Sequence, residues 1–138
     1  MMRVNAKGPF LVTQQALPRL RDHGRIVNIG SISGKVAQSF AAGYGMSKRA
    51  LQSLTFSTAV AVAKRGITCN LIAPGAVATD FIAVLRAKPG FDEGTARVTP
   101  MGRIGQPEDI AGAVMMLCRD EAGWVTGNVI EAAGGIAL

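Results

Sequence analysis

The residues best suited to chemistry are a tyrosine, a lysine and a serine that lie close together in the sequence. Tyr44 and Lys48 are four residues apart, and Ser31 lies thirteen residues before Tyr44. Side chains four apart on a helix share one face, so the Lys48 ammonium can stabilise a tyrosine phenolate and lower a phenol pKa that is ordinarily about 10. A phenol tuned in this way can transfer a proton near neutral pH. The spacing therefore indicates acid–base chemistry.

The composition indicates one α/β domain of moderate size. The chain has 138 residues, of which 49% are hydrophobic and 17% are charged, and it contains 17 glycines. This length suffices for one hydrophobic core, and the balance of residues is not that of a disordered chain. We therefore expect residues 1–138 to form a single domain, although the chain is short for a complete nucleotide-binding sheet enzyme.

Composition also disfavours several functional classes. The apolar runs are shorter than the roughly 20 residues of a membrane helix, and the first residues lack the apolar block of a secretion signal, so we expect a cytoplasmic protein without membrane contact. The net charge of +6 comes from cations scattered between Arg3 and Arg119, and aromatic residues make up only 5%. A solvated surface explains this pattern better than nucleic-acid binding does.

The cysteines and the single histidine do not suggest a metal or redox site. Cys69 and Cys118 both lie in apolar stretches with no histidine nearby. We expect two buried free thiols, without a disulfide or a metal ion. His23 lies in a polar stretch between elements, which is typical of a solvated loop.

Strand and helix patterns alternate along the chain. Strands are predicted at residues 25–29, 67–72 and 128–133, the second broken at Ala73, and helices at residues 5–21, 43–65 and 107–118. Residues 76–106 are rich in glycine and proline, and we expect a long flexible excursion with one short helix near residues 79–88. This alternation predicts a parallel sheet with right-handed crossovers.

Several further motifs accompany the tyrosine–lysine pair in a fixed order. They are Asn5 in the first helix, Asn28-Ile29-Gly30-Ser31, the Tyr44 to Lys48 pair, Asn70 to Gly75 followed by Thr79, Arg103 to Ala111, and Gly134-Gly135. In this order they resemble the motifs of the classical short-chain dehydrogenases/reductases over essentially the whole chain. A lone tyrosine–lysine spacing is weak evidence because it occurs often by chance, but six motifs in the right order are strong.

The resemblance implies the fold and the reaction. The fold would be α/β, a partial Rossmann-like doubly wound parallel sheet of about three strands. The reaction would be NAD- or NADP-dependent reduction of a small-molecule ketone or oxidation of a secondary alcohol. Such chemistry takes its hydride from the cofactor, while the protein supplies positioning and charge.

The resemblance also implies roles for individual residues. Tyr44 would be the acid/base, Ser31 would hydrogen-bond the same substrate oxygen, and Lys48 would lower the tyrosine pKa and hold the nicotinamide ribose hydroxyls. Asn5 would keep a water that links Lys48 to solvent. The residues facing the nicotinamide ring would be Pro74, Gly75, Val77 and Thr79, which join Tyr44 and Lys48 as the cofactor-binding set.

Other interpretations of these residues remain open from the sequence. Ser31 could be an ordinary turn residue, and Ser33 competes with it. Asn5 could be a helix cap instead of a catalytic residue, since asparagine is favoured at that position. A serine hydrolase is improbable, because neither serine is central in a G-x-S-x-G pattern and His23 precedes both.

One part of the family pattern is missing from these 138 residues. There is no T-G-x-x-x-G-x-G or G-x-G-x-x-G turn to hold a pyrophosphate at a helix amino terminus. We therefore expect a carboxyl-terminal half with weak or no binding of NAD or NADP, whose first strand has an unpaired edge open to another chain. The stretch Glu131 to Gly134 also departs from the usual acidic-glycine ending, which puts the contacts of the last strand in doubt.

A different function is possible for the same fold. In the family, the two long helices usually form the dimer surface, so the predicted helices at 5–21 and 43–65 would make the chain a homo-oligomer. If activity has been lost, the chain would be a non-enzymatic self-associating module.

Overall fold

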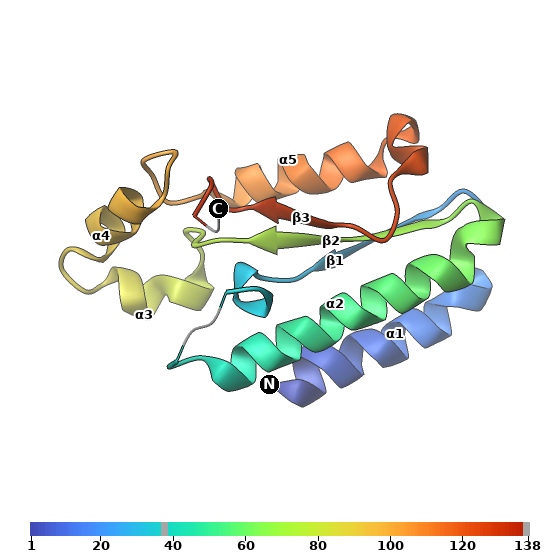
Figure 1. Cartoon of the computed structure of the whole chain (residues 1–138), viewed down its shortest axis with the longest axis horizontal. Helices are drawn as coiled ribbons and strands as arrows, with labels where there is room; N and C mark the ends of the chain where they lie inside the picture. The colour runs from blue at the N-terminus through green and yellow to red at the C-terminus, as the bar shows by residue number, and fades with distance from the viewer. Residues whose placement is uncertain (37–38, 137–138) are drawn as a thin grey trace.

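The computed structural model describes residues 1–36 and 39–136, and its centre is a parallel sheet (Figure 1). The strands are β1 (Arg25–Ile29), β2 (Thr68–Pro74) and β3 (Val129–Ala132), hydrogen-bonded in the order β1-β2-β3. Helix α2 (Ala42–Val62) covers one face of the sheet, and α5 (Pro107–Cys118) covers the other. The predicted α/β fold, a doubly wound parallel sheet of about three strands, is confirmed.

The middle strand is buried along almost its whole length. Every residue of β2 from Thr68 to Ala73 is buried, as expected for a parallel strand that carries helices on both faces. Between β2 and α2, a core cluster contains Leu51, Leu71 and Ala73. The prediction that this strand breaks at Ala73 is wrong, because it continues through Pro74, which pairs with Ala132 of β3. A proline needs no N–H there, since the strand ends at that residue.

The two crossovers do not have the same hand. Each steps one strand in the same direction across the sheet, from β1 to β2 and from β2 to β3. Their long helices, α2 and α5, lie on opposite faces (Figure 1). Two such connections must have opposite hands, so the prediction of right-handed crossovers is wrong for one of them. The right-handed rule describes a direct strand–helix–strand unit, whereas the connection from β2 to β3 first passes through a long excursion.

Strand β1 is at the edge of the sheet, as predicted. The backbone N–H of Gly30 donates to the carbonyl oxygen of Ile72 in β2. Because successive residues of a strand direct their backbone groups to opposite sides, the carbonyl of Ile29 points toward the open side of β1. This open side borders the segment that carries the tyrosine and the lysine.

The first helical segment begins and ends two residues earlier than predicted and is more irregular. It consists of a π-helical turn η1 (Arg3–Lys7), helix α1 (Gly8–Ala16) and a 3-10 turn η2 (Leu17–Arg19). Pro18 prevents a regular continuation, since a proline inside a helix lacks the N–H that the preceding turn would bond. The segment is tied to the end of α2 by Arg65, which donates to the Leu17 carbonyl and to Asp22.

The excursion between β2 and α5 is more helical than predicted. The expected short helix is present as η5 (Asp80–Ile82) and α3 (Ala83–Arg86), but α4 (Phe91–Val98) was not foreseen. Gly90 and Gly94 indicated a flexible segment, yet Gly90 caps α4 with a φ of 77° and Gly94 lies within it. The remaining short turns are η3 (Ile32–Gly34), η4 (Ala63–Arg65) and η6 (Asp120–Trp124).

The predictions for the histidine and the two cysteines are confirmed in part. His23 is an exposed loop residue, as expected, with a left-handed φ of 61°. Both cysteines are free, but only Cys69 is buried and Cys118 is exposed. Cys118 is the last residue of α5, and an apolar neighbourhood in the sequence does not reveal which side of a helix end faces the sheet. Within the described ranges, no helix is both long and apolar enough to cross a membrane.

Candidate active site

The sequence motifs meet at the carboxyl end of the sheet. Ser31 follows β1 after one residue, and Pro74-Gly75 ends β2. Adjacent parallel strands end at the same edge, which is where α/β proteins build their sites. The amino-terminal part of α2, which holds Tyr44 and Lys48, begins at this edge as well (Figure 1).

Tyr44 and Lys48 lie one helical turn apart on α2, as their spacing predicts. The Lys48 Nζ atom is 5.8 Å from the centroid of the Tyr44 ring. The same nitrogen donates a hydrogen bond of 3.0 Å to the Ile29 carbonyl oxygen at the end of β1. Burial lowers the pKa of the Lys48 ammonium, because a charged group is less stable away from water. Lys48 therefore joins the helix to the open side of β1, beside the tyrosine.

Ser31 is held by the turn that it starts. Its backbone is extended, and its Oγ accepts a hydrogen bond of 3.1 Å from the Ser33 N–H. The turn η3 packs directly on α2. A Cβ atom at Gly45 would lie only 2.7 Å from the Ser33 carbonyl oxygen, so the glycine next to Tyr44 permits this close approach. The structure thus brings the serine loop against the first turn of the tyrosine helix.

Asn5 reaches the same helix from the other side. It lies within η1, and its Nδ2 donates a hydrogen bond of 3.1 Å to the Ser47 Oγ. Ser47 is fully buried and donates in turn to the Tyr44 carbonyl oxygen at 2.7 Å. Asn5 is therefore not a helix cap, and that alternative is wrong. Ser47 was missed by sequence reasoning, although its place three residues after Tyr44 was a signal.

The predicted cofactor wall follows β2 as a turn with several backbone hydrogen bonds. Gly75 donates to the Ala132 carbonyl, and a Cβ at Gly75 would lie 3.1 Å from the Ala133 Cβ. The following residues bridge to Gly105, whose backbone bonds Ala76 and Ala78. This leaves the N–H of Val77 on the side that faces away from Gly105. Thr79 donates both its N–H and its hydroxyl to the Val77 carbonyl.

An aromatic residue from the excursion lies against the tyrosine. The rings of Tyr44 and Phe81 have centroids 5.9 Å apart and are tilted by 31°. Sequence reasoning did not single out Phe81, because a phenylalanine two residues after Thr79 carries no distinctive pattern. A hollow of about 330 Å³ nearby is lined by residues such as Gly105 and Glu131 and not by Tyr44.

The motif that begins at Arg103 stabilises the start of α5. Arg103 forms two hydrogen bonds with the Asp109 carboxylate, at 2.7 and 2.8 Å, and the same carboxylate accepts the Gln106 N–H at the start of α5. The Arg103 guanidinium and the Gln106 N–H hold the pKa of Asp109 well below its usual range. This pair fixes the start of α5. No cluster of three metal-ligating side chains occurs among residues 1–36 and 39–136.

Known proteins resemble this chain over its full length but not over theirs. A family model described as enoyl-(acyl carrier protein) reductase matches residues 1–137. The (3R)-3-hydroxyacyl-CoA dehydrogenase of Mus musculus is 39% identical over 141 residues, which include 100% of this chain and 54% of the relative. The 3-oxoacyl-(acyl-carrier-protein) reductase FabG of Aquifex aeolicus is 37% identical, over 99% of this chain and 55% of the relative.

Solved structures agree with this assignment. The angucycline C-6 ketoreductase LanV with bound NADP superposes with a TM-score of 0.93 and 36% identity, over 99% of this chain and 52% of that chain. This chain therefore spans about half the length of the relatives that it matches. The family model, the sequence identity and the shared fold lead to one conclusion: this chain belongs to the short-chain dehydrogenase/reductase family.

Proposed function

We propose that this chain carries the proton-transfer site of an NAD- or NADP-dependent oxidoreductase, which reduces a ketone or oxidises a secondary alcohol. The observation that carries the proposal is the Lys48 ammonium beside the Tyr44 ring at the carboxyl end of β1. A small-molecule substrate and a cytoplasmic location belong to the same proposal. The relatives named above are dehydrogenases and reductases, which supports this reaction class.

The proposed roles combine the family resemblance with the contacts described above. In the direction of reduction, the Tyr44 hydroxyl donates its proton to the substrate oxygen, and the Lys48 ammonium stabilises the phenolate that remains. Ser31 donates a hydrogen bond to the same oxygen and keeps it within reach of the phenol. Asn5, through Ser47, fixes the first turn of α2, and we retain it as the residue that orders a proton-relay water. Oxidation of an alcohol uses the same groups in reverse.

The residues that face the nicotinamide half of the cofactor fit that group. Gly75 lets the end of β2 pack closely against Ala133. The Val77 N–H is turned to the side on which a carboxamide oxygen could accept it. Pro74 and Thr79 complete this wall, and Lys48 lies where ribose hydroxyls can be bound. When bound, the cofactor supplies or removes the hydride at the substrate carbon.

Cofactor affinity is part of the proposal. These residues contact only one half of a dinucleotide, and the 138 residues contain no glycine-rich phosphate turn. We expect weak binding of NAD or NADP to this polypeptide. Calorimetry that gave a low-micromolar dissociation constant for either cofactor would contradict this expectation.

The test of the proposal is a comparison of cofactor oxidation by the wild-type chain and by Tyr44→Phe. With millimolar NADPH or NADH and a panel of ketones, the wild-type chain should oxidise the cofactor, and the variant should lose about 100-fold or more of that rate, the usual scale of general acid catalysis. Met116→Ala, which truncates an exposed side chain on α5, is the matched control. Equal rates for wild type and Tyr44→Phe would refute the assignment of Tyr44.

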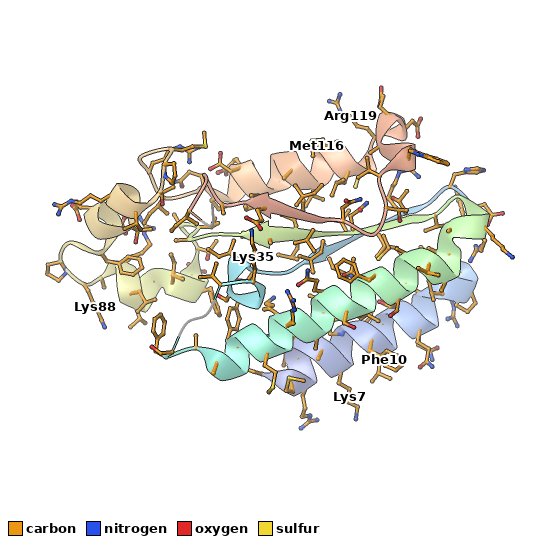
Figure 2. The ribbon with its side chains drawn as sticks, in the orientation of Figure 1. Lys7, Phe10, Lys35, Lys88, Met116 and Arg119 are labelled. Atoms are coloured by element: carbon orange, nitrogen blue, oxygen red, sulfur yellow. The ribbon has the colours of Figure 1, made fainter. Side chains whose placement is uncertain are left out.

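Self-association through α1 and α2 is the second candidate function. Apolar side chains on these helices are exposed, and Figure 2 shows Phe10 on the side of α1 that faces away from the sheet. The members of this exposed set are Val4, Phe10, Leu11, Val12, Met46, Phe56 and Val60. Exposed apolar side chains on two packed helices are the kind of surface that often forms an interface. Sedimentation should then show a homo-oligomer, and a stable monomer would count against this function.

A further inference from the structure

Phe81 is the aromatic side chain that borders the proposed proton donor. It belongs to η5, at the start of the excursion, and its ring contacts the Tyr44 ring with a centroid distance of 5.9 Å. Yet Phe81 is 78% exposed, so most of the ring is free to contact another molecule. An exposed phenyl ring beside a phenol offers a substrate an apolar surface directly next to the reacting oxygen.

Other exposed apolar side chains lie on the segments that flank this contact. They are Val36 and Phe40 in the loop before α2, and Val84 and Leu85 in α3. Monomeric proteins rarely expose so many large apolar groups on two neighbouring segments without a use for them. Val36 and Phe40 precede Tyr44 in the chain, and Val84 and Leu85 follow Phe81 within four residues.

The charged residues of these segments are largely neutralised by one another. Lys35, four residues after Ser31, forms an ion pair of 2.7 Å with Glu131 of β3 (Figure 2). On the excursion, Arg86 pairs with Asp92 at 2.8 Å, and Arg103 pairs with Asp109. Figure 2 shows Lys88 at the outer end of the excursion, pointing away from the sheet. Lys48, the cation beside Tyr44, already donates to the Ile29 carbonyl oxygen. A carboxylate or phosphate on the substrate would therefore have to compete with one of these pairs, or with the contacts of Lys48, to gain a cation.

We propose that Phe81 determines specificity by packing against an apolar substituent of the substrate, and that the substrate class is a neutral ketone or secondary alcohol bearing an aromatic or other bulky apolar group. This inference rests on the proposed function of Tyr44, since it describes the substrate of that same site. The proton still moves between the Tyr44 hydroxyl and the substrate oxygen, and Phe81 takes no part in that step.

The test uses two ketones that differ only in charge. Acetophenone and 4-acetylbenzoate share the phenyl ring and the carbonyl, and the second carries a carboxylate. Tyr44 is the single tyrosine of the chain, so ring-labelled tyrosine gives NMR signals from this residue alone. Acetophenone should shift these signals in a saturable manner and should bind at least threefold more tightly than 4-acetylbenzoate.

Variants of Phe81 then show whether the phenyl ring is responsible. Phe81→Ala should weaken acetophenone binding about three- to tenfold, the range expected for one aromatic contact, whereas Phe81→Leu should retain part of the affinity. Trp124→Ala, which removes an even more exposed aromatic side chain in η6, should behave as wild type. A CD spectrum of each variant shows that it is folded, and exposure of Phe81 makes this the expected result.

Three results would overturn the inference: Phe81→Ala binds acetophenone as wild type does, 4-acetylbenzoate binds as tightly as acetophenone, or neither ketone shifts the Tyr44 signals. Failure of the proposed function looks different. In that case the Tyr44→Phe variant oxidises the cofactor as fast as wild type, whatever the binding experiment shows. If binding depends on Phe81 but no turnover is seen, the proposed contact between Phe81 and the substrate is supported. The proposed enzymatic function is then refuted.

Discussion

The two regions that meet at Tyr44 are built in opposite ways. On one side, β2 and α2 hold the candidate acid/base through buried contacts, such as Leu71 against Leu51 and the buried hydroxyl of Ser47. On the other side, the excursion of α3 and α4 has no buried residue in either helix and presents Phe81 and Val84 to solvent. In the proposed function, the buried region would hold the proton donor in place while the exposed one would adapt to a substrate.

The largest effect should come from the buried region. Leu71→Ala removes a side chain that is 2% exposed from the cluster between β2 and α2. It should lower the free energy of unfolding by about 2–5 kcal/mol, a large part of a total that is typically about 5–15 kcal/mol. Urea denaturation measures this. Val84→Ala in the excursion should change stability by less than about 0.5 kcal/mol, and equal losses for both variants would erase the contrast between the regions.

Hydrogen exchange should reveal the same contrast without any substitution. Amides of β2 open only when the whole fold opens, whereas amides of α3 and α4 lie in exposed helices that can open locally. Exchange in residues 80–98 should be faster than in residues 68–73 by a factor on the order of 100 or more. Peptide-level mass spectrometry can measure this, and similar protection in both segments would contradict the idea of an adaptable excursion.

These contrasts also explain what the sequence could and could not predict. The strands, α2 and α5 were predictable because apolar runs and a proline at the first turn of a helix are local signals, and α5 does begin at Pro107. Helix α4 was not, because Gly90 and Gly94 look like chain breakers unless the left-handed cap at Gly90 is known. The prediction of right-handed crossovers failed for one connection because its hand depends on where the long excursion returns to the sheet. No local pattern in the sequence shows this.

The residues of the candidate site likewise include some that local sequence patterns predict and some that they do not. The tyrosine, lysine and serine could be chosen from spacing and motif order, and the structure brings Lys48 beside Tyr44 and the Ser31 loop against α2. Partners that depend on tertiary contact could not be chosen in this way. Ser47 accepts a hydrogen bond from Asn5, which is 42 residues away in the sequence. Lys35 pairs with Glu131, which is 96 residues away.

The two cysteines offer a chemical probe of burial. Cys69 is fully buried in β2 and Cys118 is exposed, so a thiol reagent such as DTNB at pH 8 should label one thiol per folded chain quickly and the second only after unfolding. Burial also raises the pKa of Cys69 to about 11 from an ordinary 9.0. The unfolded chain then loses this proton first, so stability should fall as pH rises from 9 toward 11. This slope should be smaller in Cys69→Ala.

The lysine of the site contributes the opposite sign to the pH dependence. Because burial lowers the pKa of Lys48, the unfolded chain holds that proton to higher pH than the folded chain does. Between the folded and unfolded pKa values, the Lys48 contribution to stability therefore rises with pH. Lys48→Met should make the alkaline fall in stability steeper.

Rapid labelling of both thiols in the folded chain would contradict the burial on which the Cys69 prediction rests.

A small effect on stability should also come from the partly exposed ion pair that joins the serine loop to β3. Lys35→Met breaks the pair with Glu131 of β3, whose side chains are 57% and 26% exposed. Because pairs of this kind are screened by solvent, the loss should be below about 1 kcal/mol and should shrink further in high salt. A larger, salt-independent loss in urea denaturation would show that the serine loop is held more firmly than its exposure suggests.

The central claim is that Tyr44 transfers the proton while Phe81 only binds the substrate, and steady-state kinetics of the two variants test it most directly. With acetophenone and millimolar NADPH or NADH, Tyr44→Phe should lose about 100-fold or more in kcat. Phe81→Ala should raise KM about three- to tenfold with kcat nearly unchanged. A Tyr44→Phe chain that keeps the wild-type kcat would contradict the account.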